Sequence, residues 1–379
     1  MPKRAHRQCS LQRDYDDPTK TDLAEPVEAL PFFRTTAPKE EQPFDKLRES
    51  GFGVDVVTQI VAVDIGGTHA RFALAEIADG RVQSLAEPVT LKTAEYASFQ
   101  TAWEAFGAKL GNPLPPAAAI AFAGPVGGEV LQLTNSHWAI RPTLIKERLH
   151  VDRFSLVNDF GAVGHAVAQA DPRHFRHICG PDTAFPDTGV TSVVGPGTGL
   201  GVAHVVRASG HYHVCATEGG HLDFAPLDAF EDGLLETLRK RYRRVSVERV
   251  VSGPGLRGIY EAFARIEGRT VDTDDDKALW TAALDGSDSL AVASLDRFCM
   301  SLGSVAGDLA LAQGANAVVI AGGLGARIAD HLPQSGFAQR FAAKGRFEAM
   351  MAAIPVKLIT LDQPGLYGAA AAYATEHSL

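Results

Sequence analysis

One local pattern, a strand followed by a glycine-rich turn and a second strand, occurs twice in this chain of 379 residues. In the first copy, an apolar run over residues 57–64 ends at an acidic residue, Gly66 and Gly67 form the turn, and residues 71–76 return as a strand. In the second copy, residues 191–195 lead into a turn with glycine at every other position, and residues 200–207 return. We interpret this as a weak internal repeat, and a chain of this length has room for two lobes.

The segments between and after these hairpins alternate in periodicity between strand and helix. In the first half the order is three strands, a helix, a strand and a further strand–helix pair, which predicts a mixed sheet with helices packed on it. The expected elements there are strands at 81–92, 117–123 and 153–158 and helices at 96–110 and 160–169. In the second half we expect a helix at 295–313, a strand at 317–321, a turn at Gly322-Gly323, a strand at 356–361 and a helix at 366–375.

Residues 1–55 differ from the rest of the chain. They are rich in proline and charged residues and show no sustained period of helix or strand, which predicts a disordered or loosely attached extension. A misassigned translation start and a regulatory arm are alternatives. A DNA-binding head is disfavoured, because no pair of helical patterns joined by a tight turn is visible.

Composition excludes several classes of function. The chain is 45% hydrophobic and 21% charged, which is typical of a globular enzyme. Its net charge of -9 argues against nucleic-acid and anionic-membrane partners, and no apolar run approaches the roughly 20 residues that a membrane span requires. The four cysteines are scattered without a Cys-x-x-Cys pair, which favours a reducing cytoplasm.

The first glycine turn has the residues expected of a phosphate site. Gly66 and Gly67 let backbone N–H groups approach phosphate oxygens, and Thr68 adds a hydroxyl donor. Arg71 adds a positive charge for the transferring group, and Asp64, at the end of a strand, is a candidate ligand for Mg²⁺, directly or through water. A plain hairpin with Gly-Gly at its turn is the alternative.

The second glycine turn is a candidate for a second phosphate site. Repeated glycine costs chain entropy, so we expect close approach of the backbone to another group, with Gly197 and Thr198 at the centre of the turn. A flexible turn is the alternative. A Walker A motif is absent, and a dinucleotide-binding fingerprint fits poorly because a strand pattern follows the turn.

A carboxylate between the two turns is a candidate general base. Asp159 follows the strand at 153–158 and opens a helix, so the helix N-terminus is expected to favour its ionised form. There it can accept a proton from a hydroxyl group. A simple helix cap is the alternative.

Polar residues further along favour a sugar site. Glu218 and His221 flank a glycine pair and offer both an acceptor and a donor to hydroxyl groups, and Glu248 precedes another glycine turn. A zinc site using His211, His213 and Cys215 is a weaker reading, because no closed four-ligand set is present.

Taken together, these motifs resemble those of the bacterial ATP-dependent glucokinase family, within the actin-like ATPase and sugar-kinase superfamily. The resemblance covers roughly residues 58–377 and rests on motifs in the same order, at residues 64–68, 123–125, 134–138, 158–160, 195–201, 218–221, 248–255 and 322–323. One departure is His69, where the family usually has asparagine. The sugar-kinase and repressor group with a cysteine-rich zinc motif is not matched, since paired cysteines are missing.

The resemblance implies a two-lobed α/β fold of the actin-like (ribonuclease H-like) class, with a cleft between a smaller and a larger domain. The expected smaller domain is residues 56–168 plus 362–379, and the larger is 169–361. The resemblance implies phosphoryl transfer from ATP, with Mg²⁺, to the C6 hydroxyl of glucose, in a cytoplasmic enzyme that is commonly a homodimer. It assigns glucose binding to Asn158, Asp159, Glu218, His221 and Glu248, with Asp159 as the base, and ATP binding to Val63, Asp64, Ile65, Gly66, Gly67, Thr68, Gly197, Thr198, Gly322 and Gly323. A kinase for another hexose and a sugar sensor without turnover are the alternatives.

Overall fold

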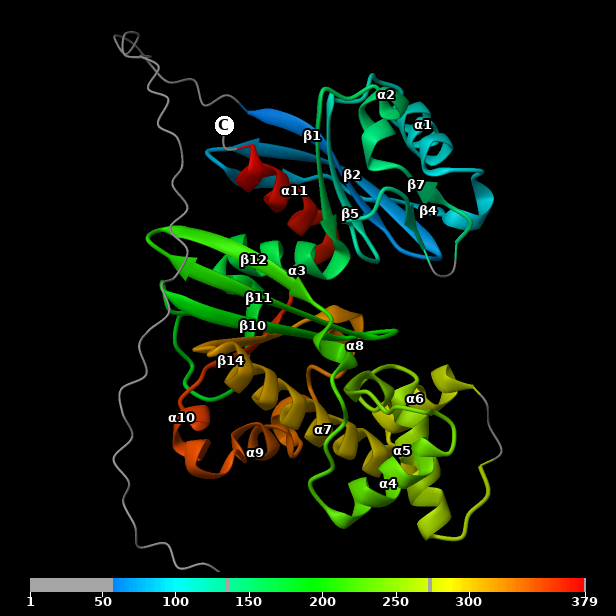
Figure 1. The fold of residues 1–379 in the computed structure, drawn as a ribbon, viewed down its shortest axis with the longest axis vertical. Coiled ribbons are helices and arrows are strands. Elements are labelled where there is room, and N and C mark those ends of the chain that lie inside the picture. The colour runs from blue at the N-terminus through cyan, green and yellow to red at the C-terminus, as the bar shows by residue number, and fades with distance from the viewer. Residues whose placement is uncertain (1–56, 134–135, 272–274, 378–379) are drawn as a thin grey trace, which may run out of the picture. The chain divides into compact units, whose positions relative to one another are not determined.

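The fold is taken from a computed structural model that describes residues 57–133, 136–271 and 275–377. The predicted extension, residues 1–55, lies outside the described residues. The described chain forms two mixed sheets with helices packed against them (Figure 1).

The first sheet has the strand order β3-β2-β1-β5-β8, with β4 also paired to β2. Its central strand β1 is antiparallel to β2 and parallel to β5, which is in turn parallel to β8. The strands are β1 (Thr58–Ile65), β2 (His69–Ala78), β3 (Arg81–Leu85), β4 (Val89–Lys92), β5 (Ala117–Phe122) and β8 (Arg153–Asn158).

The second sheet repeats this pattern. Its order is β12-β11-β10-β13-β14-β9, and β10, like β1, is antiparallel to the next strand in sequence and parallel to a later one. The strands are β9 (Phe175–Cys179), β10 (Gly189–Pro196), β11 (Leu200–Ala208), β12 (His211–Thr217), β13 (Ala317–Ile320) and β14 (Val356–Ile359). The internal repeat expected from the two glycine hairpins is therefore confirmed.

Two helices lie between the sheets. The alanine-rich helix α11 (Pro364–Glu376) packs on the first sheet, and α3 (Asp159–Gln169) packs on β10, β11 and β13 of the second through residues such as Val163 and Ala166. The two helices also pack on each other, and a Cβ at Gly368 would overlap the carbonyl of Ala162. Small residues are therefore required where these helices meet.

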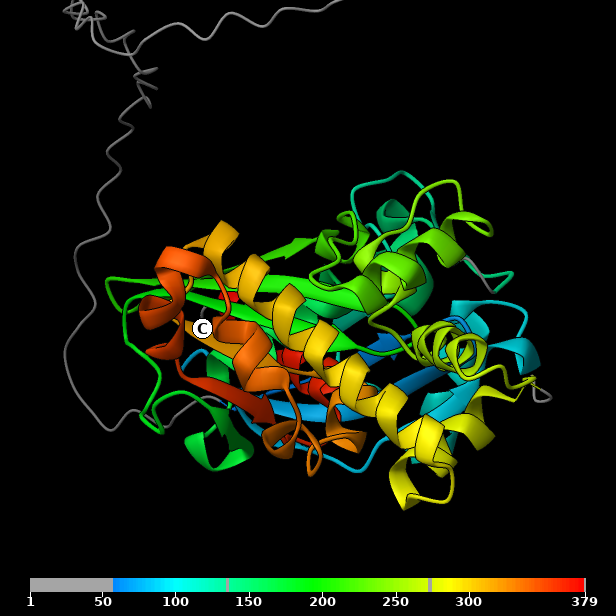
Figure 2. The same cartoon turned by 90° about the horizontal axis from the view of Figure 1, so that it is seen from below.

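The outer faces of the sheets carry the remaining helices. In the first half these are α1 (Phe99–Leu110) and α2 (Ile145–Leu149), and the short strands β6 (Leu131–Gln132) and β7 (Ala139–Ile140) lie nearby. In the second half the long helix α7 (Ser289–Gln313) runs along the outer face, as Figure 2 shows from below. The others are α4 (Ala229–Arg239), α5 (Gly255–Ile266), α6 (Asp276–Asp285), α8 (Gly322–Arg327), α9 (Phe337–Ala342) and α10 (Glu348–Ala352).

Several expected elements differ in detail. The strand expected at 81–92 is two strands, since Pro88 has no N–H group to donate and the pairing with β2 is interrupted. The helix expected from residue 96 begins at Phe99, because Ser98 caps it with a capping box. The turn expected at Gly322-Gly323 is the start of α8. Helices α4–α6 were not expected from the periodicity of the sequence.

None of the helices in the described part of the chain combines the length and the hydropathy that a bilayer crossing requires.

Candidate active site

Asp159 lies at the junction of β8 and α3, and its neighbour Asn158 forms this junction. The Asn158 side-chain oxygen accepts hydrogen bonds from the N–H groups of Phe160 (2.9 Å) and Gly161 (3.0 Å), which caps the helix. Its amide nitrogen donates to the carbonyl of Gly124 at 3.2 Å. One amide hydrogen of Asn158 is left to meet a ligand.

The carboxyl group of Asp159 is less acidic than the sequence predicted. Its pKa is raised from 3.8 to about 6, chiefly by burial and also by the negative charges of Asp64 and Glu218, while the N–H group of Phe160 opposes the shift. The expectation that the helix N-terminus favours the ionised form is therefore wrong in its net effect, because desolvation outweighs the local donor. A carboxylate with a pKa near working pH is suited to act as a general base.

Phe160 explains two of the four glycines in the second turn. Gly195 and Gly201 pair directly across β10 and β11, and a Cβ at either would overlap the Phe160 ring. The Phe160 side chain on α3 thus packs in the space that these two glycines leave on the β10–β11 hairpin, which carries the second turn. The expected close approach of the backbone to another group is therefore confirmed at these two positions, where that group is a side chain of the protein itself.

Glu248 accounts for a third glycine. Its Oε2 accepts a hydrogen bond from the N–H group of Leu200 at 2.9 Å, and a Cβ at Gly199 would overlap that oxygen. The turn at Gly253 also lies close, because its N–H group donates to the carbonyl of Gly197 at 2.7 Å. Of the four glycines, Gly197 alone has no atom nearer than 4.0 Å to a built Cβ.

Asp64 and Arg71 face each other across the first hairpin. They are partners in the β1–β2 register and form an ion pair of 3.1 Å between Oδ2 and Nη1. Asp64 also lies at the start of α11, since a Cβ at Gly365 would be 2.9 Å from its Oδ2. Burial raises the pKa of Asp64, and the charge of Arg71 opposes that shift. The arginine expected to meet a phosphoryl group thus binds Asp64 in this structure.

Both glycine turns present unused backbone donors. Among the described residues, the N–H groups of Gly67, Thr68, Thr198 and Gly199 donate to no acceptor, and neither threonine hydroxyl forms a hydrogen bond. Thr68 and Thr198 are both exposed. Unpaired N–H groups at a turn form a concave site suited to phosphate oxygens.

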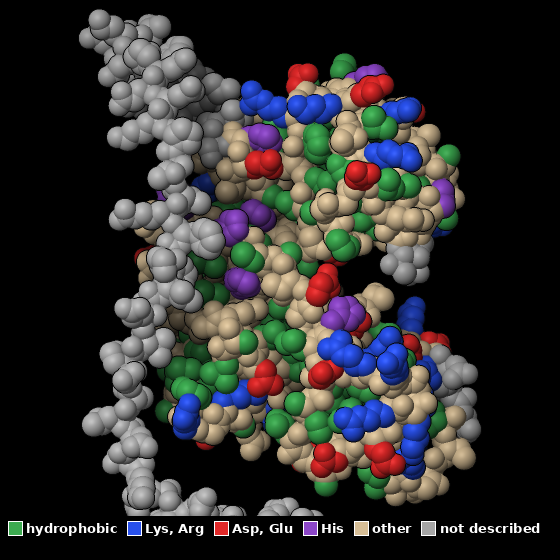
Figure 3. Space-filling view, in the orientation of Figure 1, with side chains coloured by type: hydrophobic (Ala, Val, Ile, Leu, Met, Phe, Trp, Pro, Cys, Tyr) green, Lys and Arg blue, Asp and Glu red, His purple; other side chains and the backbone are tan. Residues whose placement is uncertain are grey.

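The first turn is held from one side and opens onto a cavity. The hydroxyl of Thr93 donates to the carbonyl of Gly67 at 2.8 Å, and the N–H group of Thr93 donates to the carbonyl of Thr68 at 3.0 Å. The cavity is about 440 Å³ and is lined by Gly67, Thr68, Thr93 and residues that include Lys92 and His137. The face shown in Figure 3 is hollowed between the two halves, with acidic side chains and a histidine at the edge of the hollow.

The other predicted residues fall into three groups. Val63 and Ile65 are fully buried in the core, so only their backbone is available to a nucleotide. Glu218 and His221 are exposed, with 3.9 Å between Oε2 and Nε2. Gly322 abuts the second turn, since a Cβ there would lie 2.8 Å from the carbonyl oxygen of Pro196, and Gly323 faces open space.

The acidic residues fit Mg²⁺ and do not fit zinc. The Oδ1 of Asp64 accepts no hydrogen bond from the described residues, and Mg²⁺ commonly takes one or two carboxylates together with substrate phosphates. No group of three histidine, cysteine, aspartate or glutamate residues arranged to hold a metal occurs in the described ranges. The described residues therefore do not support the alternative of a zinc site at His211, His213 and Cys215 on β12.

Comparison with known proteins places the chain in a family. A model of the family described as Glucokinase matches residues 61–376. The chain belongs to the glucokinase family. It is 64% identical to the glucokinase of Zymomonas mobilis over 320 residues, which cover 84% of this chain and 99% of that protein, and 41% identical to the glucokinase of a Caulobacter species, covering 82% and 93%.

Solved structures give the same result for the fold. The crystal structure of a glucokinase from an Antarctic psychrotroph aligns with a TM-score of 0.74 at 35% identity, over 83% of this chain and 98% of that one. A Balamuthia mandrillaris glucokinase in complex with glucose aligns with a TM-score of 0.67 at 21% identity, over 84% and 94%, which supports the fold alone. The two-lobed α/β class implied by the glucokinase resemblance is confirmed.

Sequence reasoning missed Phe160 and Thr93 as supports of the glucokinase site. A signal for Phe160 was present, since an aromatic residue beside Asp159 and two glycines at matching hairpin positions are complementary in size. No local signal marks Thr93, because its contact with the first turn depends on how β4 pairs with β2. His69, the departure from the family pattern, begins β2, and its carbonyl accepts from the N–H group of Gly66 at 2.9 Å.

Proposed function

We propose that this protein is a glucokinase that transfers the γ-phosphoryl group of ATP to the C6 hydroxyl of glucose, giving glucose 6-phosphate and ADP, the first step of glucose catabolism. One observation carries this proposal. The carboxylate of Asp159 is close enough to Asp64 and to Glu218 for both charges to raise its pKa, while the adjacent Phe160 packs on the second glycine hairpin. The surroundings of Asp159 thus include a residue of the first nucleotide segment and a residue expected to bind sugar, and its neighbour Phe160 contacts the second hairpin, which supports the proposal.

In this proposal, the polar side chains bind and orient the sugar. Asn158, Glu218, His221 and Glu248 bind glucose hydroxyls, which require both donors and acceptors. Asp159 accepts the proton of the C6 hydroxyl as that oxygen attacks the γ-phosphorus. Ionised Asp159 is available for this step above about pH 6.

The backbone turns bind the nucleotide. The unused N–H groups at 67–68 and 198–199 hold phosphate oxygens and stabilise the charge that develops on the transferred group. Residues 63–68 form the first segment, Gly197 and Thr198 the second, and Gly322 and Gly323 lie against the adenosine. Asp64 would hold Mg²⁺, directly or through water, and the bound ion would shield the phosphate charge. Arg71 keeps Asp64 in place through their ion pair, and its remaining N–H donors would be available to the phosphoryl group.

The decisive experiment is identification of the product. Full-length protein is mixed with Mg-ATP and glucose, and the sugar and phosphorus NMR spectra are followed. Glucose 6-phosphate formed at a rate proportional to enzyme, and lost with Asp159→Asn, is the expected result. Glucose binding without turnover would replace this proposal with a sugar-sensing role.

Sugar specificity is tested separately. Coupled ATP assays over glucose, fructose and mannose compare kcat/KM for each hexose. We expect glucose to give the highest value, and a higher value for another sugar would make this a kinase for that hexose.

Three further statements belong to the proposal. The smaller domain (56–168 with 362–379) and the larger domain (169–361) close over the sugar and keep water from the phosphoryl group. The enzyme is a cytoplasmic homodimer, with neither nucleic acid nor membrane as a partner. Light scattering after size exclusion tests the homodimer, and cell fractionation tests the cytoplasmic location.

A further inference from the structure

A second cavity lies at the opposite end of α3 from Asp159. It measures about 590 Å³ and surrounds the C-terminal end of α3 at Val167 and Ala170. We propose that this cavity binds a small anion carried on an apolar ring, with a phosphate monoester or a carboxylate as its head group. Its volume lies within the range of roughly 300–1,000 Å³ that small-molecule sites occupy.

Two arginines provide the recognition of the anion. Arg207 donates to the carbonyl of Ala168 at 2.9 Å, and Arg81 donates to the carbonyl of Gln169 at 3.4 Å. No carboxylate of the described chain lies within ion-pair distance of either guanidinium. Each guanidinium has five N–H donors, so most of these donors are left for a ligand.

The charges around Arg207 leave room for an anion beside the two arginines. Burial lowers the pKa of Arg207, Tyr212 and Asp187 in the cavity wall oppose the lowering, and the positive charge of Arg81 adds a smaller contribution to it. The two cations are thus close enough to repel each other. A bound phosphate or carboxylate would offset that repulsion and accept paired hydrogen bonds from the arginine forks.

The remaining wall is aromatic. Phe175 and Phe185 both line the cavity and meet edge to face, with 5.0 Å between their centroids and 83° between their planes. Lys357 is already neutralised by Asp182 at 3.3 Å and lies 5.6 Å from the centroid of the Phe185 ring. The wall therefore suits an apolar ring, and the two arginines carry the free positive charge.

The position of the cavity ties it to both sheets. Arg81 begins β3 of the first sheet, and Arg207 lies on β11 of the second. A ligand held by both arginines therefore bridges the two halves beside α3, the helix that begins at the catalytic base. Nothing in the proposed kinase reaction uses these residues.

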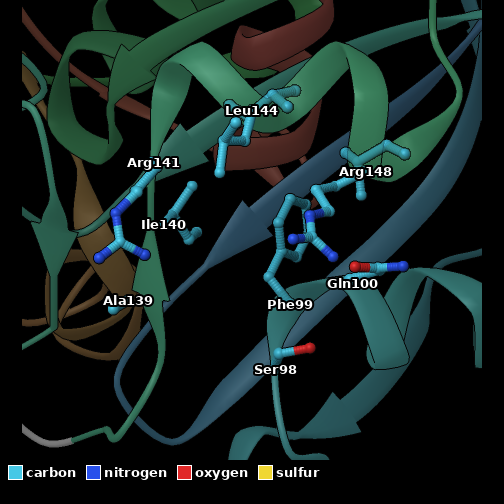
Figure 4. Close-up of a pocket in the computed structure, with 10 residues that line it drawn as sticks. Ser98, Phe99, Gln100, Ala139, Ile140, Arg141, Leu144 and Arg148 are labelled. Atoms are coloured by element: carbon cyan, nitrogen blue, oxygen red, sulfur yellow. The ribbon is translucent and has the colours of Figure 1, made fainter.

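Another cavity provides a matched control. It measures about 280 Å³ and includes two arginines, Arg141 and Arg148, that also form no ion pair with the described residues. Figure 4 shows these two side chains apart from one another, with Leu144 between them. Both are exposed, and each can meet an anion only singly.

Calorimetry on the full-length protein tests the proposal. Phenyl phosphate and benzoate are titrated in the presence of glucose and a non-hydrolysable ATP analogue, so that the phosphate turns are already occupied. Benzyl alcohol provides the ring without the charge, and inorganic phosphate provides the charge without the ring. The variants are Arg207→Gln, Arg81→Gln, Arg207→Lys and the control Arg148→Gln, each checked by thermal unfolding.

We expect one saturable site for phenyl phosphate or benzoate, and the tighter of the two identifies the head group. Arg207→Gln and Arg81→Gln should each weaken it by about tenfold or more, Arg207→Lys by less, and Arg148→Gln not at all. Benzyl alcohol and inorganic phosphate should each bind at least about tenfold more weakly than the tighter anion.

Three results would overturn the proposal. The first is no saturation by either ring anion up to about 10 mM. The second is parental affinity in Arg81→Gln, whose exposed side chain can be changed without disturbing the core. The third is equal weakening by Arg148→Gln, which would show binding to surface cations in general.

Discussion

At the scale of single residues, the balance of forces on Asp159 sets how readily its carboxyl group takes up a proton. A helix N-terminus alone would keep this carboxyl group strongly acidic. Burial and two neighbouring carboxylates instead raise its pKa to about 6. The side chain is therefore basic enough to take a proton from a sugar hydroxyl and still ionised at neutral pH.

Asp159→Asn tests the base directly. The amide keeps an oxygen for the N–H group of Phe160 and cannot accept a proton, so turnover should fall by about 10²–10⁴-fold while glucose binding remains measurable. Steady-state assays and glucose calorimetry provide the two readouts. Turnover within tenfold of the parent would contradict the assigned role.

The same substitution should stabilise the fold at alkaline pH. Because the pKa is about 6 in the folded protein and 3.8 ordinarily, the folded state keeps a proton between these values that the unfolded chain has released. The free energy of unfolding therefore falls as pH rises through this window, and the loss persists above it. At pH 8, Asp159→Asn should raise it by on the order of 1–3 kcal/mol, measured by urea denaturation. At pH 3.5 parent and variant should converge, and a gain of the same size there would point to another cause.

Glu218 should shift the pH dependence of catalysis. The kcat/KM of the parent is expected to decline as pH falls through about 6, and Glu218→Gln should move this limb to lower pH because one charge that raises the pKa of Asp159 is gone. Glu236→Gln, an exposed glutamate on α4 paired with Lys240, is the control. If the acidic limb of the kcat/KM profile of Glu218→Gln stays at the pH of the parent, the charge of Glu218 does not raise the pKa of Asp159.

At the scale of elements, α3 and the β10–β11 hairpin are fitted together by one ring. Phe160 occupies the space that Gly195 and Gly201 leave, and Glu248 holds the turn through the N–H group of Leu200. Alternate glycine in this hairpin therefore serves two purposes. Gly195, Gly199 and Gly201 make room for side chains of the protein, and Gly197 keeps the turn open.

Two alanine substitutions separate these purposes. Gly201→Ala should lower the free energy of unfolding by about 1–3 kcal/mol because the new methyl group overlaps the Phe160 ring. Gly197→Ala should leave stability nearly unchanged, since its Cβ meets nothing nearer than 4.0 Å, and raise the KM for ATP. Denaturation curves and ATP kinetics give the readouts.

A double-mutant cycle isolates the contact. Phe160→Ala combined with Gly201→Ala should cost less stability than the two single changes added together, because the alanine methyl group then enters space that the ring has left. Strict additivity would show that the two residues do not interact.

At the scale of the whole molecule, two similar halves meet through α3 and α11. Each half supplies a hairpin with a glycine turn, and the helices between the sheets approach so closely that Gly368 has no room for a side chain beside Ala162. Asp64 borders the start of α11, and Asp159 begins α3. The two carboxylates proposed to act in catalysis are thus located where the two halves join.

The segment before the first strand is expected to be dispensable. Removing residues 1–50 should change neither the midpoint of thermal unfolding nor kcat/KM for glucose, because the repeated sheets and their helices lie within the later residues. Matched assays on the full-length and shortened proteins test this. A large loss of stability or activity would assign the segment a function.

Local sequence determined much of this protein. Strand and helix periodicity was sufficient for a mixed sheet with packed helices, because it depends on residues adjacent in the chain. The motifs and their order carried the resemblance that implied the two-lobed fold class and the glucokinase family. Helix α11 begins within a few residues of its expected start. Strand β8 spans the expected residues, and Asp159 follows it directly.

Tertiary structure alone decided how those parts act on one another. The raised pKa of Asp159 depends on burial and on carboxylates 95 and 59 residues away along the chain, which no local pattern reports. The same is true of the Phe160 ring between two glycines and of Arg81 beside Arg207, which are brought together from different sheets. Desolvation, packing and long-range charge depend on distances in space, and these exist only once the chain has folded.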